Sequence, residues 1–225
     1  AIPQAFIPYK EVLDIYNAGL QVPDDVTLIW CDDNYGYIRH FPTAEERARK
    51  GGNGIYYHVS YWGRPHDYLW LGTFSPYLLH QQMKLAYDRG IQKMWVLNVG
   101  DIKPAEYQIE LFLDMAWNID EVNEIGVTAH LKSWLGREFG SNCAEELLPA
   151  MEAHYQLSYI RKPEFMGNTR EEERDPKYKV IKDLPWSEQT ISERLRSYTV
   201  LSDVVERMES NIPADRQDAY FQLVK

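Results

Sequence analysis

An alternation of strand-like and helix-like segments in the first half of the chain constrains its fold most strongly. Runs rich in β-branched and aromatic residues cover 26–31, 54–62 and 91–100, and 67–73 is a further short strand or extended segment. The first run, VTLIWC, is almost continuously apolar, as is typical of a strand that is buried on both faces. We also expect the run at 91–100 to be a buried strand.

Helix signals separate these runs. Apolar residues at helical spacing predict a helix over 10–20, and Thr43 is a good N-cap for a short charged helix. The clearest helix is 75–90, which starts with Ser75 as N-cap and ends at Gly90. Strands that alternate with helices indicate βα units around a parallel sheet, so the fold class is α/β.

The pattern changes near residue 126, after which only helical segments are recognisable. We therefore divide the chain into an α/β part, 1–125, and a helical bundle, 126–225. Residues 163–186 are charged and contain proline, which predicts a long loop between two helices. A last helical pattern runs into the chain end, so we expect the bundle to be incomplete.

Composition narrows the classes of ligand. The net charge of -10 argues against nucleic acid and anionic membranes as partners. Aromatic residues make up 13% of the chain, which favours carbohydrate or another ring-bearing ligand, although an aromatic-rich core is the alternative. The sequence as given has no signal peptide and no apolar run of membrane length. Cys31 and Cys143 are predicted to be free thiols.

Polar side chains gather where the strand-like runs end. The first run is followed by Asp32, Asp33 and Asn34, and the last contains or is followed by Asn98, Asp101 and Lys103. In parallel α/β folds, ligands bind at the carboxyl ends of the strands, so these two clusters predict one site. N-capping and turn formation are the alternative roles for the aspartates.

A third cluster follows the middle run and contains His58, Tyr61, Trp62 and Arg64. Several ionisable and aromatic groups close together are typical of a binding loop. Arg39, Arg64 and Lys103 are candidates to bind an anionic substrate group, because arginine can bind a carboxylate with two hydrogen bonds. Each could instead be an ordinary surface charge.

These residues predict an aromatic-lined, carboxylate-rich site, which suits a glycosidase that uses two carboxyl groups. Asp32 and Asp33 are adjacent and point to opposite faces of a strand, so they are not expected to be the acid/base pair themselves. A hard cation bound by Asp32, Asp33 and Asp101 is the metal alternative. The sequence contains no HxxxH, CxxC, phosphate loop or GxSxG motif.

Three motifs carry a specific resemblance. DDNYGYIR at 32–39, GGNGIYYH at 51–58 and LNVGDIKPAE at 97–106 occur in this order and at family-like spacing, so the chain resembles glycoside hydrolase family 115, the xylan α-1,2-glucuronidases. The resemblance covers about residues 24–120 and continues more weakly through YIRKPEFMG at 159–167.

The resemblance implies an inverting enzyme that removes glucuronic or 4-O-methylglucuronic acid from xylan and needs no cofactor. It implies a (β/α)8-like barrel followed by a helical bundle, within a longer chain. Residues 1–125 would then be the later part of the barrel, so we expect the fragment to be inactive alone. A secreted or periplasmic location follows from the polymeric substrate.

The resemblance also assigns roles. Asp32 or Asp33 would activate water or orient the sugar, and Asn98 would bind sugar hydroxyls. His58, Tyr61 and Arg64 would line the uronic-acid pocket, whereas Asp101 and Lys103 would bind substrate or anchor their loop. Family members often carry a glutamate where this chain has 75–83, which contains none, so the second carboxylate is not identified. The substrate-binding candidates are Asn34, Arg39, His58, Tyr61, Trp62, Arg64, Asn98, Asp101 and Lys103, and no metal ligand is assigned.

Two other functions stay open. One is a non-catalytic carbohydrate-binding or assembly module, and the other is a metal-dependent hydrolase that uses Asp32, Asp33 and Asp101. The expected partners are a xylan or glucuronoxylan oligosaccharide, the remainder of the parent chain and a second copy of the chain in a homodimer.

Overall fold

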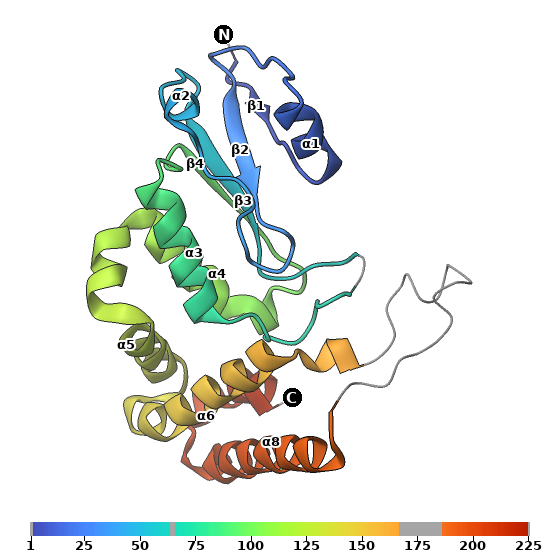
Figure 1. Ribbon diagram of the computed structural model, residues 1–225. Helices are drawn as coiled ribbons and strands as arrows, with labels where there is room; N and C mark the ends of the chain where they lie inside the picture. The colour runs from blue at the N-terminus through green and yellow to red at the C-terminus, as the bar shows by residue number, and fades with distance from the viewer. Residues whose placement is uncertain (1, 64–65, 167–185, 225) are drawn as a thin grey trace.

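The computed structural model describes residues 2–63, 66–166 and 186–224 (Figure 1). Its sheet has four parallel strands: β1 (Ala5–Phe6), β2 (Thr27–Cys31), β3 (Asn53–His58) and β4 (Met94–Asn98). The strands lie in the order β1-β2-β3-β4, so each one pairs with its neighbour in the sequence. This order is that of consecutive strands in a βα barrel, and it confirms the predicted α/β class.

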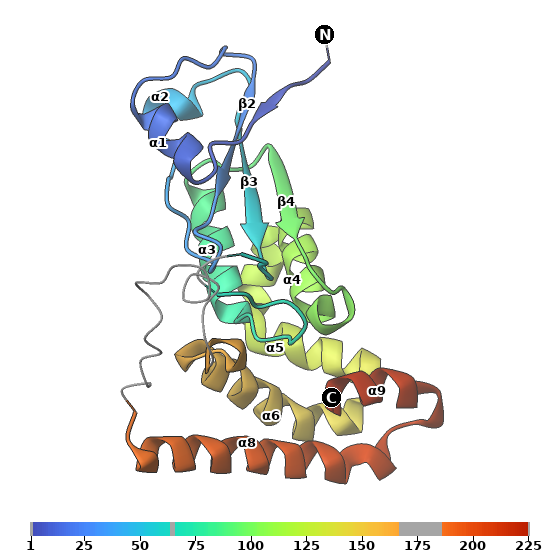
Figure 2. The ribbon, with the colours of Figure 1, turned by 90° about the vertical axis from the view of Figure 1, so that its right-hand side faces the viewer.

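Helices alternate with these strands as predicted. They are α1 (Glu11–Asn17), α2 (Ala44–Arg47), α3 (Pro76–Asp88) and, after the 3-10 turn η1 (Lys103–Ala105), α4 (Glu106–Trp117). Thr43 and Glu46 form a capping box on α2, and the Ser75 side chain caps α3. Figures 1 and 2 show α3 and α4 on one face of the sheet, where Leu79 and Phe112 belong to the core.

Two strand predictions differ from the structure. β1 was not predicted, because it has only two residues and therefore shows no periodicity. β4 was predicted to be buried, but its residues are half-buried or exposed, since β4 pairs only with β3 and lies at one edge of the sheet. The segment 67–73 adds no strand to the sheet and makes one isolated antiparallel bridge, between Tyr61 and Tyr68.

Helices account for the second half of the described chain. They are α5 (Ile119–Phe139), α6 (Ser141–Ile160), α8 (Glu188–Met208) and α9 (Gln217–Val224), with 3-10 turns η2 (Pro163–Met166), η4 (Glu209–Asn211) and η5 (Ala214–Arg216). Figure 1 shows α5, α6 and α8 below the sheet. Of the loop predicted at 163–186, residues 167–185 lie outside the described residues. The division of the chain at 125/126 stays a prediction, although α5 contains a non-helical residue at Gly126.

One cluster of buried apolar residues runs from the sheet to the last helix and includes Trp30, Tyr57, Leu135 and Tyr220. The sheet and the helical part therefore share a core. Cys31 and Cys143 are buried free thiols, as predicted. Among the described residues, no helix is long and apolar enough to cross a membrane.

Candidate functional site

A buried carboxylate–imidazole pair joins the ends of β2 and β3. The Asp32 Oδ1 atom lies 2.6 Å from Nδ1 of His58, and the two side chains are 0% and 3% exposed. The backbone N–H of Gly36 donates to Oδ2 of Asp32 at 2.9 Å, so both carboxylate oxygens are occupied. The sequence placed both residues at strand ends, and the register of the sheet brings them into contact.

Three tyrosines fix the plane of the His58 ring. Tyr9 stacks on the imidazole with ring centroids 5.9 Å apart, while Tyr56 and Tyr61 meet it edge-on at 4.8 Å and 5.8 Å. The contact with Asp32 engages Nδ1 and leaves Nε2 as the second nitrogen of the ring. The arrangement therefore holds the Nε2 atom in a fixed orientation.

Asn34 is held in an unusual conformation beside this pair. Its φ is +72°, a left-handed value that asparagine tolerates better than most residues. The Tyr9 hydroxyl donates to Oδ1 of Asn34 at 2.7 Å, and the Tyr68 hydroxyl donates to its backbone carbonyl at 2.5 Å. Burial raises the pKa of both tyrosines, so their hydroxyls stay protonated as donors at neutral pH. The predicted site residue Asn34 is thus immobilised from two sides.

Sequence reasoning missed Tyr9 and Lys10, which follow β1. The Lys10 ammonium donates to the Tyr61 hydroxyl at 2.7 Å. Lys10 has φ +52° and ψ −122°, a backbone conformation that normally requires glycine. Strained residues cluster at functional sites, and Lys10 supplies positive charge close to His58. The one available signal was the cluster of ring and charged residues at 9–11, because β1 is too short to be recognised.

Asp33 forms a turn rather than facing His58. Its Oδ1 accepts hydrogen bonds from the backbone N–H groups of Tyr35 and Tyr37 at 3.0 Å and 3.1 Å. Its Oδ2 pairs with Arg39 at 3.0 Å, and the Arg39 side chain is 65% exposed. Asp32 and Asp33 thus have separate partners, as their alternation along the strand predicted. Arg39 is engaged with the turn, and its predicted contact with a substrate stays a prediction.

Asn98 joins the same cluster from β4. It pairs with His58 in the strand register, and its side-chain amide donates to the Tyr56 hydroxyl. Tyr56 in turn contacts the His58 ring. The predicted residues Asp32, Asn34, His58, Tyr61 and Asn98 are therefore brought together at the carboxyl ends of three adjacent strands.

Three other predicted residues, Asp101, Lys103 and Trp62, are exposed. Asp101 is exposed and makes no hydrogen bond or ion pair with any described residue. Lys103 pairs with Glu106 at 2.6 Å, which fits the alternative role of anchoring its loop. Trp62 is 70% exposed. Arg64 lies outside the described residues.

The three aspartates of the metal alternative do not form a cluster. Within the described part of the chain, one group of three or more potential ligands has its ligand atoms within 4.8 Å of one another, and it consists of Glu110, Asp114 and His130. The structure does not group Asp32, Asp33 and Asp101 as metal ligands, because the adjacent Asp32 and Asp33 have different protein partners and Asp101 follows another strand, β4.

A second titratable pair, also missed, supports the site loops from the helical side. Lys162 donates to the Thr73 carbonyl at 2.7 Å and lies over the Tyr68 ring, and burial lowers its pKa to about 8. Glu164 accepts a hydrogen bond from the Thr73 hydroxyl, and burial raises its pKa. The adjacent Phe165 packs edge-on against Tyr68. The 162–165 segment therefore holds the loop that follows β3.

Two comparisons with known proteins point to the same family. The model of glycosyl hydrolase family 115 matches residues 1–165. A solved structure is similar with 74% sequence identity and a TM-score of 0.94, and it is described as a novel family GH115 4-O-methyl-α-glucuronidase, BtGH115A, with specificity for decorated arabinogalactans. The match covers 99% of this chain and 29% of that chain. No curated protein sequence matches significantly.

Proposed function

Because the chain belongs to glycosyl hydrolase family 115, we propose that it forms part of a glycosidase that releases glucuronic or 4-O-methylglucuronic acid from a decorated polysaccharide. One observation carries the proposal. Asp32 and His58 form a buried pair that neighbours Asn34, Tyr61 and Asn98 at the carboxyl edge of a parallel sheet. This edge is where barrel enzymes place their catalytic groups.

In this proposal, Asp32 acts through His58. The Asp32 carboxylate is fully buried and already accepts two hydrogen bonds, so it has no free oxygen for water or sugar. It holds the imidazole, whose Nε2 is the ring nitrogen left to hydrogen-bond with a sugar hydroxyl or with the attacking water. Lys10 and Asn98 supply donors for the uronate and for ring hydroxyls.

Inversion requires an acid and a base whose carboxyl groups lie about 6.5–9.5 Å apart. Glu11 and Asp101 are the candidates within the described chain, because both are exposed and follow strands at this edge. Glu11 is favoured, since Tyr9 and Lys10 contact site residues and thereby anchor the preceding peptide. The chain spans 29% of the similar solved chain, so a carboxylate from elsewhere in the parent protein is the further candidate.

Two polysaccharides are candidate substrates. α-1,2-linked glucuronic acid on xylan is the substrate class that the sequence motifs imply. A decorated arabinogalactan is the class named for the similar solved structure, whose 74% identity favours it. A secreted or periplasmic location belongs to the same proposal, because such polymers do not enter cells intact.

The alternative is a non-catalytic carbohydrate-binding module. It is favoured by one observation, namely that each carboxylate oxygen of Asp32 and of Asp33 already contacts a protein group. A module of this kind would bind oligosaccharide but release no uronic acid.

The test measures uronic acid release by the intact parent protein from glucuronoxylan and from arabinogalactan. Proton NMR of the first product should show the β-anomer if the enzyme inverts.

Glu11→Gln should lower the rate about 10²–10⁴-fold if Glu11 is the acid or base. If Glu11 is the general acid, the variant should still hydrolyse an aryl glucuronide with an activated leaving group, because that leaving group departs without protonation. Glu45→Gln, at an exposed position on α2, is the control. No release from either polymer would contradict the glycosidase proposal.

A further inference from the structure

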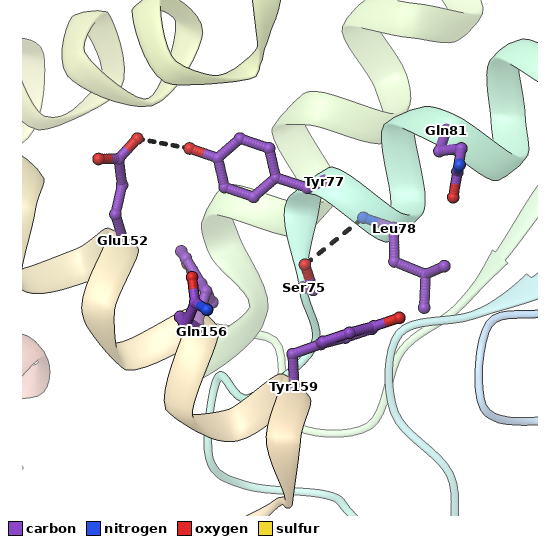
Figure 3. A pocket seen from close by; sticks show the side chains of 8 residues that line it. Ser75, Tyr77, Leu78, Gln81, Glu152, Gln156 and Tyr159 are labelled. Carbon is purple, nitrogen blue, oxygen red and sulfur yellow. Dashed lines mark hydrogen bonds between the residues drawn. The ribbon is translucent and has the colours of Figure 1, made fainter.

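A cleft beside the site loops lies between the start of α3 and the second half of α6. It has a volume of about 670 Å³, which is within the range of small-ligand sites. The lining residues are Ser75, Tyr77, Leu78, Gln81, Glu152, Tyr155, Gln156 and Tyr159. Figure 3 shows the side chains of both helices around this space. None of these residues belongs to the Asp32–His58 cluster.

The geometry points to a subsite for a neutral sugar of the polysaccharide backbone, the part of the substrate that carries the uronic acid. This inference rests on the proposed function, and it assigns the cleft to the sugars next to the scissile bond.

The lining combines aromatic rings with unpaired amides. Tyr77 and Tyr159 are 39% and 58% exposed, so each has ring surface available for the apolar side of a sugar. Gln81 on α3 and Gln156 on α6 are exposed, and neither makes a side-chain hydrogen bond to a described residue. Amide groups both donate and accept, as sugar hydroxyls do. The lining therefore offers the two kinds of contact that a sugar needs.

One side of the cleft is pre-organised. The Tyr77 hydroxyl donates to Glu152 at 2.5 Å, and Thr128 donates to the same carboxylate oxygen at 2.9 Å (Figure 3 shows the first of these bonds). These bonds fix the Tyr77 ring between the two helices. A fixed ring loses less conformational entropy when a ligand binds.

The charge of the lining selects against an acidic sugar. Among the described residues that line the cleft, Glu152 is the one carboxylic acid, and there is no lysine, arginine or histidine. A uronate would meet a carboxylate and no cation from these described residues, whereas a neutral pyranose or furanose carries no charge for Glu152 to repel. The cleft and the Asp32–His58 cluster, which Lys10 contacts through Tyr61, thus suit different parts of one substrate.

A direct contact connects the cleft with the site loop. The Tyr159 and Tyr37 hydroxyls lie 3.0 Å apart, and the Tyr37 backbone N–H donates to Asp33. Tyr37 is part of the loop that starts at Asp32, so this contact joins that loop to α6. A backbone sugar in the cleft would lie beside the loop that carries the candidate site.

The test uses the intact parent protein and uronate-free oligosaccharides, xylotriose and a β-linked galactotriose, with binding followed by NMR titration. Tyr159→Ala and Gln156→Ala should each weaken binding at least tenfold. Tyr159→Phe keeps the ring and should stay within about threefold. Gln222→Ala, on an exposed part of α9, is the matched control and should change nothing. Circular dichroism checks that each variant is folded.

Kinetics separate this inference from the proposed function. KM for the decorated polysaccharide should rise about tenfold in Tyr159→Ala and Gln156→Ala, while KM for an aryl glucuronide without a backbone stays unchanged. Unchanged oligosaccharide binding in both folded variants would overturn the subsite, whatever the activity. Loss of binding in variants of a protein that releases no uronic acid would support the subsite and contradict the glycosidase proposal alone.

Discussion

Asp32 and His58 come from neighbouring strands and meet through a 2.6 Å contact between Oδ1 and Nδ1, with both side chains almost fully buried. Removing one partner leaves the other buried and unpaired, so Asp32→Ala and His58→Ala should each lower the free energy of unfolding by about 2–4 kcal/mol. Urea denaturation measures this change. The double variant should lose much less free energy of unfolding than the sum of the losses in the two single variants.

Asp114 and His130 provide the matched control for this pair. Their side-chain atoms lie 3.0 Å apart, but the Asp114 side chain is 50% exposed. Asp114→Ala should therefore cost less than about 1 kcal/mol. Equal losses from Asp32→Ala and Asp114→Ala, or additive losses in the Asp32/His58 double variant, would contradict a coupled buried pair.

Two substitutions at Asp33 separate its turn from its ion pair. Asp33→Asn keeps an oxygen for the backbone N–H groups of Tyr35 and Tyr37 and loses only the exposed pair with Arg39, so it should cost less than about 1 kcal/mol. Asp33→Ala also removes the turn acceptor and should cost about 1–2 kcal/mol more. Thermal unfolding of both variants checks the order, and the reverse order would contradict the turn role.

Gly36 is required by both its conformation and its surroundings. Its φ is +97°, and an added Cβ would lie 2.5 Å from Cζ of Phe74. Gly36→Ala should therefore cost about 3 kcal/mol or more, from backbone strain and overpacking together. Gly19 has φ +105° with no atom within 4 Å of the added Cβ, so Gly19→Ala isolates the backbone cost of about 1 kcal/mol. Equal urea midpoint shifts would show that Phe74 does not restrict this loop.

Lys10 combines a strained backbone with a hydrogen bond to Tyr61. Lys10→Ala and Lys10→Gly both remove the ammonium group, but only glycine relieves the strain. Lys10→Gly should therefore be more stable than Lys10→Ala by about 1 kcal/mol. Chemical denaturation of the two variants gives the difference directly. A less stable glycine variant would show that the positive φ carries no strain.

Lys162 gives the protein an alkaline pH dependence. Its pKa is about 8 when folded and 10.5 ordinarily, because burial disfavours the charged form. Between these values the unfolded chain binds more protons, so the free energy of unfolding should rise as pH increases from 8 to 10.5. Below pH 8 the amine is charged in both states and the burial penalty is constant. Urea titrations from pH 7 to 10.5 should show this rise relative to Lys162→Met.

Glu164 gives the free energy of unfolding the opposite pH dependence, and at a lower pH. Burial raises its pKa from 4.5, so the folded state holds the proton more tightly and stability should fall as pH rises above 4.5. Glu164→Gln should remove this slope, and the alkaline rise should begin at a lower pH, because the Glu164 charge raises the Lys162 pKa. If the free energy of unfolding of the wild type ran parallel to that of Lys162→Met above pH 8, the lowered pKa of Lys162 would be contradicted.

The local elements could be predicted from the sequence because their signals are local. The β2 run, the capping box at Thr43 and the Ser75 start of α3 each depend on residues within a few positions of one another. The separation of Asp32 from Asp33 follows from strand alternation in the same way. Family membership also followed from three short motifs in order.

The site itself depends on the tertiary structure. Tyr9 reaches Asn34 across 25 residues and Lys10 reaches Tyr61 across 51, through a strand too short to have a periodicity. The burial of Asp32, which changes it from a free carboxylate to the partner of His58, requires the register of β2 and β3. Sequence alone thus determined which chemical groups stand at the strand ends. Packing decided which of them meet and which remain free, because hydrogen bonding and burial depend on neighbours that are distant in the chain.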